Sequence, residues 1–319
     1  MSEQSIDMNE MLNNTAQTSD KEKEKIADAT DVQEESVDIE SYINVFPGNG
    51  LNLRELVHLS ARIPVTMVMV VGPYASGKTT LMVMMYHLFR EGLNKKLRFR
   101  GSRTMRGYWK RSEKLMQYSA NEKPDMDRTS LGFSDNFLHL ALVDTKGDER
   151  DIVFVDIPGE VFSEEGEIKE LEELFADIEN MIVIMDMQKI RESSERRITV
   201  LDTKVMLSNL IKYRILSKST SLQIVCTKID SIEEDEALKQ CKGYVNKVFS
   251  EIEKNYADKV GNISIHFVSA LNLDDEEECE HLEEILDNCV SKCSIYMEKE
   301  TENNLDYLPR EMDKFRLRR

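Results

Sequence analysis

Residues 65–79 read VTMVMVVGPYASGKT. The run before the first glycine is apolar or β-branched, which is typical of a strand buried on both faces of a parallel sheet. Gly72–Thr79 then has the spacing G-x-x-x-x-G-K-[ST], and the residues from Thr80 to Glu91 have a helical pattern. The segment therefore predicts a strand, a phosphate-binding loop and a helix in succession. The alternative is a glycine turn that ends in Lys-Thr by chance, and the flanking strand and helix disfavour it.

The chemistry of such a loop explains its spacing. The glycines let the backbone wrap around a phosphate with its N–H groups pointing inward, and the positive end of the next helix faces the phosphates. Lys78 would reach the β- and γ-phosphates, and the Thr79 hydroxyl would be a ligand of Mg²⁺. The residues that we expect to contact the nucleotide here are Gly72, Tyr74, Ala75, Ser76, Gly77, Lys78, Thr79 and Thr80.

Downstream of residue 63, short apolar runs alternate with longer amphipathic segments, which predicts an α/β fold with a mostly parallel sheet. The expected strands are Val65–Val71, Phe137–Val143, Ile152–Ile157, Met181–Asp186, Leu222–Thr227 and Ile263–Val268. The expected helices are Lys78–Glu91, Met105–Ser119, Glu164–Ile178, Ser193–Ser217, Asp235–Tyr256 and Glu280–Met297. Because Asp144–Asp151 is too short for a crossover helix, Phe137–Val143 and Ile152–Ile157 should form an antiparallel hairpin at one edge.

Three further motifs follow expected strands. Asp156-Ile157-Pro158-Gly159-Glu160 has the pattern D-x-x-G, in which Asp156 can support Mg²⁺ and the Gly159 N–H can approach a γ-phosphate. Thr227-Lys228-Ile229-Asp230 has the pattern [NT]-K-x-D.

The Asp230 carboxylate can accept hydrogen bonds from guanine N1–H and its 2-amino group, which adenine cannot supply. The Lys228 stem can lie along the base. A backbone N–H of Ser269-Ala270, after the strand Ile263–Val268, can meet guanine O6. Ligands of open α/β sheets bind at the carboxyl ends of the strands, so the four motifs together predict a guanine-nucleotide site.

With these motifs, the sequence resembles the translation-factor-related class of P-loop GTPases over roughly residues 60–297. Within that class, Phe99–Thr104, Arg128–Ser130 with Phe137–Leu140, and Asp156–Glu160 look like the double-GTPase family of bacterial conflict systems. The resemblance implies a three-layer P-loop GTPase fold: a mostly parallel six-stranded sheet, one antiparallel edge strand, and a helical insertion after the first helix. It also implies binding of GTP/GDP and Mg²⁺, GTP hydrolysis, and a GTP-gated role beside protein partners, such as another GTPase or a component of a defence or stress system.

Two features depart from the family pattern. Glu160 stands where small GTPases often have the glutamine that orients the attacking water. It could slow hydrolysis, act as a general base, or be a solvent-facing charge at a helix start. A non-hydrolysing GTP-binding scaffold is therefore the first rival function, and an ATP-using enzyme, which Asp230 disfavours, is the second. The switch threonine that closes over Mg²⁺ is displaced; we assign it to Thr129, with Ser130 and Thr104 as alternatives.

The insertion at residues 90–128 carries twelve bases and five acids. Arg128, or else Arg103 or Arg106, could act as an arginine finger in cis, or the patch could dock an acidic partner such as the chain's own N-terminal arm. The alternative is a solvated helical face that also carries core residues Trp109 and Leu115.

The composition limits the remaining possibilities. The 319 residues include 60 acids and 42 bases, a net charge of −18, which disfavours sequence-independent nucleic-acid binding. We expect a disordered acidic arm at residues 1–41, a GTPase domain at 42–297 with the basic insertion at 92–130, and a tail at 298–319. Asp274–Glu280 is interpreted as a solvated acidic loop. No apolar run is long enough to span a bilayer and the five cysteines fit a reducing compartment, so a cytoplasmic protein is expected.

Overall fold

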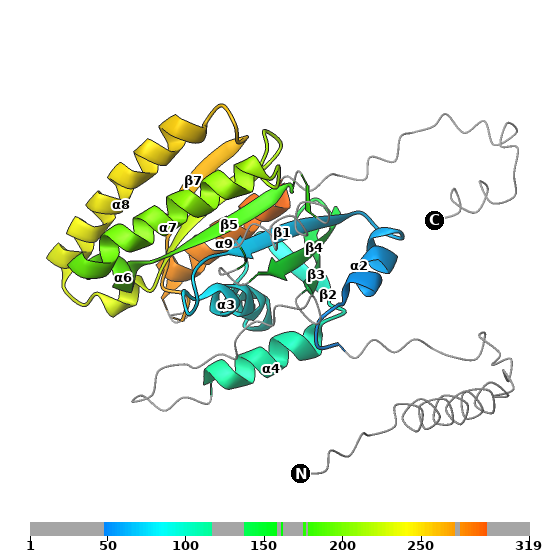
Figure 1. The fold of residues 1–319 in the computed structure, drawn as a ribbon. Helices are drawn as coiled ribbons and strands as arrows, with labels where there is room; N and C mark the ends of the chain where they lie inside the picture. Colours follow the sequence, from blue (N-terminus) through cyan, green and yellow to red (C-terminus); the bar gives the residue numbers. More distant parts are fainter. Residues whose placement is uncertain are drawn as a thin grey trace, which may run out of the picture. The chain divides into compact units, whose positions relative to one another are not determined.

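A seven-stranded sheet with the order β2-β3-β4-β1-β5-β6-β7 is the centre of the fold (Figure 1). The computed structural model describes residues 48–116, 137–157, 161, 175–176, 178–271 and 275–291. The strands are β1 (Val65–Val71), β2 (Leu97–Gly101), β3 (Phe137–Asp144), β4 (Glu149–Asp156), β5 (Asn180–Asp186), β6 (Ser221–Thr227) and β7 (Asn262–Phe267). β4, β1, β5, β6 and β7 are parallel, and β3 is antiparallel to both β2 and β4. The sequence prediction of a mostly parallel α/β sheet is confirmed.

The prediction of six strands with one antiparallel strand at the edge was wrong in the number of strands and in which strand lies at the edge. β2 is a seventh strand, it pairs with β3, and so it displaces β3 from the edge. The insertion after α3 is therefore not helical throughout. β2 reads LRFRG, in which the apolar residues alternate with arginines, as is typical of a strand with one face in contact with water.

Helices cover both faces of the sheet. They are α2 (Leu53–Ser60), α3 (Lys78–Arg90), α4 (Met105–Met116), α6 (Met187–Arg191), α7 (Ser193–Lys212), α8 (Asp235–Tyr256) and α9 (Glu276–Ser291), and a 3-10 turn, η3, spans Ile229–Ser231. Side chains alternate along β1, so Met69 and Val71 belong to one hydrophobic core and Val68 and Val70 to the other.

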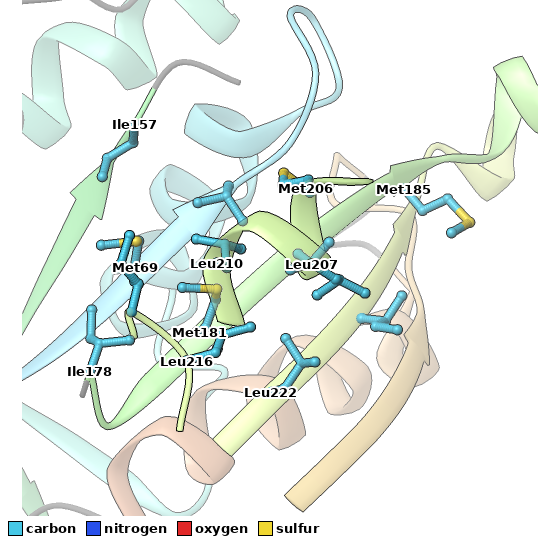
Figure 2. Close-up of a cluster of buried hydrophobic side chains, with 14 of the residues drawn as sticks. Met69, Ile157, Ile178, Met181, Met185, Met206, Leu207, Leu210, Leu216 and Leu222 are labelled. Atoms are coloured by element: carbon cyan, nitrogen blue, oxygen red, sulfur yellow. The ribbon is translucent and has the colours of Figure 1, made fainter. Parts of the chain in front are cut away.

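The first core includes residues of α2, α7 and α8. Figure 2 shows part of it, where Leu207 and Leu210 of α7 lie over Met69 and Met181 of the sheet. The second core includes residues of α3, α4 and α9. The two cores fix the strands from both sides, so the loops at the strand ends are carried on a rigid support.

Most expected helices are present, with shifts at their ends. α8 has the predicted bounds, α3 and α7 begin where predicted, and α9 begins at Glu276 rather than Glu280. The predicted helix Glu164–Ile178 lies almost wholly outside the described residues, as do the acidic arm and the tail. In α4, Leu115 is buried as expected, but Trp109 is 56% exposed, so its prediction as a core residue was wrong.

Two further findings concern the hydropathy of the helices and the positions of the cysteines. No helix within the described ranges is both long and apolar enough to cross a membrane. The four cysteines in these ranges, Cys226, Cys241, Cys279 and Cys289, are buried.

Candidate nucleotide site

The motif residues lie together at the carboxyl ends of the parallel strands. β1, β4, β6 and β7 are parallel, so their carboxyl ends lie on the same side. The loop of residues 72–77 follows β1, Asp156 is the last residue of β4, and Thr227 is the last residue of β6. This edge is where open α/β sheets bind ligands.

The loop between β1 and α3 is held in a conformation that side chains rarely allow. Ala75 has φ +56° and Gly77 has φ +94°, both in the left-handed region. At Gly72 the restriction is space rather than backbone conformation. A Cβ there would lie 3.0 Å from the Cβ of Ile184 and 3.2 Å from its carbonyl oxygen. The first glycine thus allows close approach to β5, and the second allows the turn into the helix.

Lys78 is folded back over the loop that it follows. Its Nζ donates hydrogen bonds to the carbonyl oxygens of Gly72 and Pro73, both at 3.0 Å, and the residue is buried. Tyr74 and Ala75 at the tip of the loop are exposed, whereas Ser76 is buried. The ammonium group is therefore held beside the loop by acceptors that a phosphate could replace.

Thr79 connects the loop to β4. Its hydroxyl donates a hydrogen bond of 2.8 Å to the Oδ2 atom of Asp156, whose residue is 4% exposed. Thr80, the next residue of α3, is half-buried. A hydroxyl and a carboxylate are the hard oxygen ligands that Mg²⁺ prefers, and Mg²⁺ is usually held by one or two carboxylates together with substrate phosphates. The described residues contain no group of three or more His, Cys, Asp or Glu side chains that could by itself hold a metal ion.

The end of β6 is tied to the same loop. The Thr227 hydroxyl donates to the carbonyl oxygen of Ser76 at 2.7 Å, and Lys228 Nζ donates to that of Ala75 at 2.7 Å. Lys228 Nζ also pairs with the Oδ2 atom of Asp186 at 2.6 Å. These contacts join the guanine motif to the phosphate loop directly.

Asp186 is a site residue that the sequence reasoning missed. It ends β5, its side chain is 2% exposed, and its Oδ1 atom accepts the backbone N–H of Gln188 at 2.9 Å. A signal was present, because Asp186 is an aspartate at the carboxyl end of a continuous apolar run.

Asp230 lies in η3 and is exposed. Within the described ranges its carboxylate has no hydrogen bond or ion pair. The turn before it is fixed by Lys228, which has φ +61°, and by the Ser231 hydroxyl, which donates to the Lys228 carbonyl oxygen at 2.7 Å. The Asp230 carboxylate is therefore available to bind a ligand beside Lys228, at the carboxyl end of β6.

Ser269 and Ala270 follow β7 and are both buried. The Ser269 N–H donates to the Oε2 atom of Glu278 at 2.7 Å. Glu278 lies in the first turn of α9, which begins at Glu276, so the prediction that Asp274–Glu280 is a solvated loop was wrong from Glu276 onward. No sequence signal separates Glu278 from its acidic neighbours.

Several predicted residues lie outside the described ranges: Arg128, Thr129, Ser130, Gly159 and Glu160. Of the alternatives, Thr104 is buried and its hydroxyl accepts the backbone N–H of His139 at 2.9 Å. The Arg103 N–H donates to Nδ1 of the same histidine at 3.1 Å, and Arg106 is exposed on α4. The Thr104 hydroxyl is thus engaged with β3.

The sequence matches the model of a protein family described as Double-GTPase 2 over residues 66–289, which is more than half of the chain. The matched range begins in β1 and ends in α9, so it includes every strand end described above. A search of curated proteins found no match.

Proposed function

The chain belongs to the double-GTPase family, and from this membership we propose that it binds GTP/GDP with Mg²⁺, hydrolyses GTP to GDP and phosphate, and acts as a GTP-gated switch. Its partners would be proteins, such as another GTPase or a component of a defence or stress system.

One observation carries the proposal: the motif Gly72–Thr79 is hydrogen-bonded both to β4 and to the end of β6. Thr79 contacts Asp156 at 2.8 Å, and Thr227 and Lys228 each contact a loop carbonyl at 2.7 Å. A glycine turn without a function does not require hydrogen bonds to Asp156 of one motif and to Thr227 and Lys228 of another. This linkage supports the interpretation of the motifs as one site.

The phosphate end of the site would use four side chains. Lys78 would exchange its two carbonyl acceptors for β- and γ-phosphate oxygens, and the loop N–H groups would bind the same phosphates. Thr79 and Asp156 would hold Mg²⁺, with Thr129 completing the set. When bound, Mg²⁺ would neutralise charge that develops on the phosphate oxygens.

The base end of the site depends on Asp230. Its carboxylate would accept hydrogen bonds from guanine N1–H and the 2-amino group, the Lys228 stem would lie along the base, and the N–H of Ala270 would meet O6. An adenine would leave the carboxylate desolvated without a donor, which is the basis of the expected selectivity. An ATP-using enzyme is disfavoured for the same reason.

Hydrolysis would use residues around the γ-phosphate. Water attacks phosphorus, the bond to the β-phosphate oxygen breaks, and the proton of the water leaves with the products. We assign the γ-phosphate contact to the Gly159 N–H and the stabilisation of charge to Arg128. Glu160 either accepts the proton of the water or repels the γ-phosphate, and the two roles predict opposite effects of its replacement.

Nucleotide binding tests the proposal first. Full-length protein should bind GDP and GTP on the order of a hundredfold more tightly than ADP and ATP, since a charged bidentate contact is worth several kcal/mol. Asp230→Asn should shift the preference toward xanthine nucleotides, whose 2-oxo group matches an amide donor. Asp202→Asn, an exposed aspartate of α7, is the matched control and should bind like the wild type. Equal affinities for GTP and ATP would refute the assignment.

Single-turnover hydrolysis tests catalysis separately. The isolated protein should hydrolyse GTP slowly, on the order of 10⁻⁴–10⁻² s⁻¹, as unassisted GTPases do. Lys78→Ala gives the background. Glu160→Gln should abolish turnover if Glu160 is the base and speed it if Glu160 only repels. Arg128→Ala should lower kcat with little change in GTP affinity. Wild-type turnover equal to the Lys78→Ala background would leave the non-hydrolysing scaffold.

A further inference from the structure

The loop that follows β7 is held by a carboxylate from another element. Ser269 is 3% exposed, and its backbone N–H donates to Glu278 Oε2 at 2.7 Å. The Glu278 side chain is itself only 12% exposed. A charged acceptor at this distance and in a poorly hydrated place forms a strong hydrogen bond.

α9 is a rigid support for this carboxylate. Its middle is fixed to β6, because Gln223 Nε2 donates to the Ile285 carbonyl oxygen at 3.1 Å and the Asn288 side chain donates to Gln223 Oε1 at 3.2 Å. Glu278 lies in the first turn, where the positive end of the helix stabilises its negative charge. Glu278 therefore holds the loop after β7 in a fixed position relative to the sheet.

The contact determines which backbone donor remains available. The Ser269 N–H is occupied by Glu278, whereas the Ala270 N–H has no hydrogen-bond partner among the described residues. The other end of the turn is fixed as well, since the Val268 N–H donates to the Cys226 carbonyl oxygen at 2.9 Å. With both preceding N–H groups engaged, the Ala270 N–H is the next donor along the chain.

We propose that Glu278 is a positioning residue for base recognition: it holds Ser269 so that the Ala270 N–H meets guanine O6. Glu278 does not touch the nucleotide. This inference rests on the proposed function, and it adds a residue outside the motifs that contributes to the choice of the 6-oxo base.

The test compares two nucleotides in two variants of the full-length protein. GDP carries O6 and N1–H, and the diphosphate of 2-aminopurine riboside lacks both, so the effect of each substitution is measured within one nucleotide and then compared. Glu278→Ala should weaken GDP on the order of tenfold, because the loop loses a charge-assisted hydrogen bond, while the 2-aminopurine nucleotide should change little. A general loss of structure would weaken both nucleotides equally, so the difference between them isolates positioning.

Glu277→Ala is the matched control. Glu277 is exposed, lies in the same helical turn and carries the same charge, so this variant should bind both nucleotides like the wild type. Glu278→Gln keeps an amide oxygen as acceptor and should recover part of the GDP affinity.

Equal weakening of GDP and the 2-aminopurine nucleotide in Glu278→Ala would overturn the proposal, as would no weakening of either. These results differ from a failure of the proposed function, in which the wild-type protein itself would show no preference for GDP over ADP.

Discussion

Replacing Thr227 with valine tests whether the guanine motif holds the phosphate loop. The Thr227 hydroxyl is the described hydrogen-bond partner of the Ser76 carbonyl oxygen, at 2.7 Å, and both residues are buried. Valine has nearly the same shape, so no cavity forms, but the carbonyl loses its partner. A buried polar group without a partner costs about 1–3 kcal/mol of unfolding free energy. For a domain of this size, each kcal/mol corresponds to about 2–4 °C in Tm.

Nucleotide affinity gives the more specific result. Without the contact, Lys228 Nζ is the remaining described contact from β6 to this loop, so Ala75 leaves its left-handed conformation more readily, which costs about 1–2 kcal/mol to restore on binding. We therefore expect Thr227→Val to weaken GDP by about tenfold. Thr227→Ser retains the hydroxyl and is the control; it should lose about 1 kcal/mol of stability with its methyl group but keep its GDP affinity. Unfolding is measured by urea without nucleotide, and binding by titration. Equal GDP affinities for the valine and serine variants would refute this reasoning.

Three other predictions follow from the described geometry. Gly77→Ala should lower the unfolding free energy by at least 1 kcal/mol, because φ is +94° there; urea titration beside Gly243→Ala, in the middle of α8, checks this. Asp186→Asn should lower the unfolding free energy by about 1–3 kcal/mol in the same assay. This loss is smaller than that for breaking a fully buried ion pair, because the Lys228 side chain is 33% exposed. Burial lowers the pKa of His87 and of His266 below the ordinary value of about 6.5, so the unfolded chain binds more protons. Stability should therefore be full above that pH and fall as the pH drops from 6.5 toward the lowered values; an unchanged urea midpoint between pH 7.5 and 5.5 would contradict it.

The strands that carry the motifs could be predicted from sequence because they are continuous apolar runs. β1 has the predicted bounds, and β6 differs by one residue. β2 was not predicted, since Arg98 and Arg100 alternate with its two apolar residues and the segment resembles a basic insertion. Trp109 was misjudged because an aromatic residue in an amphipathic helix is usually buried, whereas here Tyr108 occupies the core.

The residues of the candidate site also fall into those that the sequence predicts and those that it does not. Spacing along the chain was enough to select Lys78, Thr79 and Asp156, because a motif is a local pattern. Asp186 and Glu278 contact residues that lie far away in the sequence, Lys228 and Ser269. Such contacts depend on the order of the strands and on where α9 packs, which no local pattern contains.

The edge strand β2 limits how a partner protein can bind. It is five residues long, its pairing with β3 is irregular between Phe99 and Gly101, and Arg98 and Arg100 are exposed. A short, irregular and charged edge resists pairing with a strand from another molecule. β-Strand addition is therefore disfavoured at this side of the sheet, and a partner protein that binds here would contact helices or loops instead.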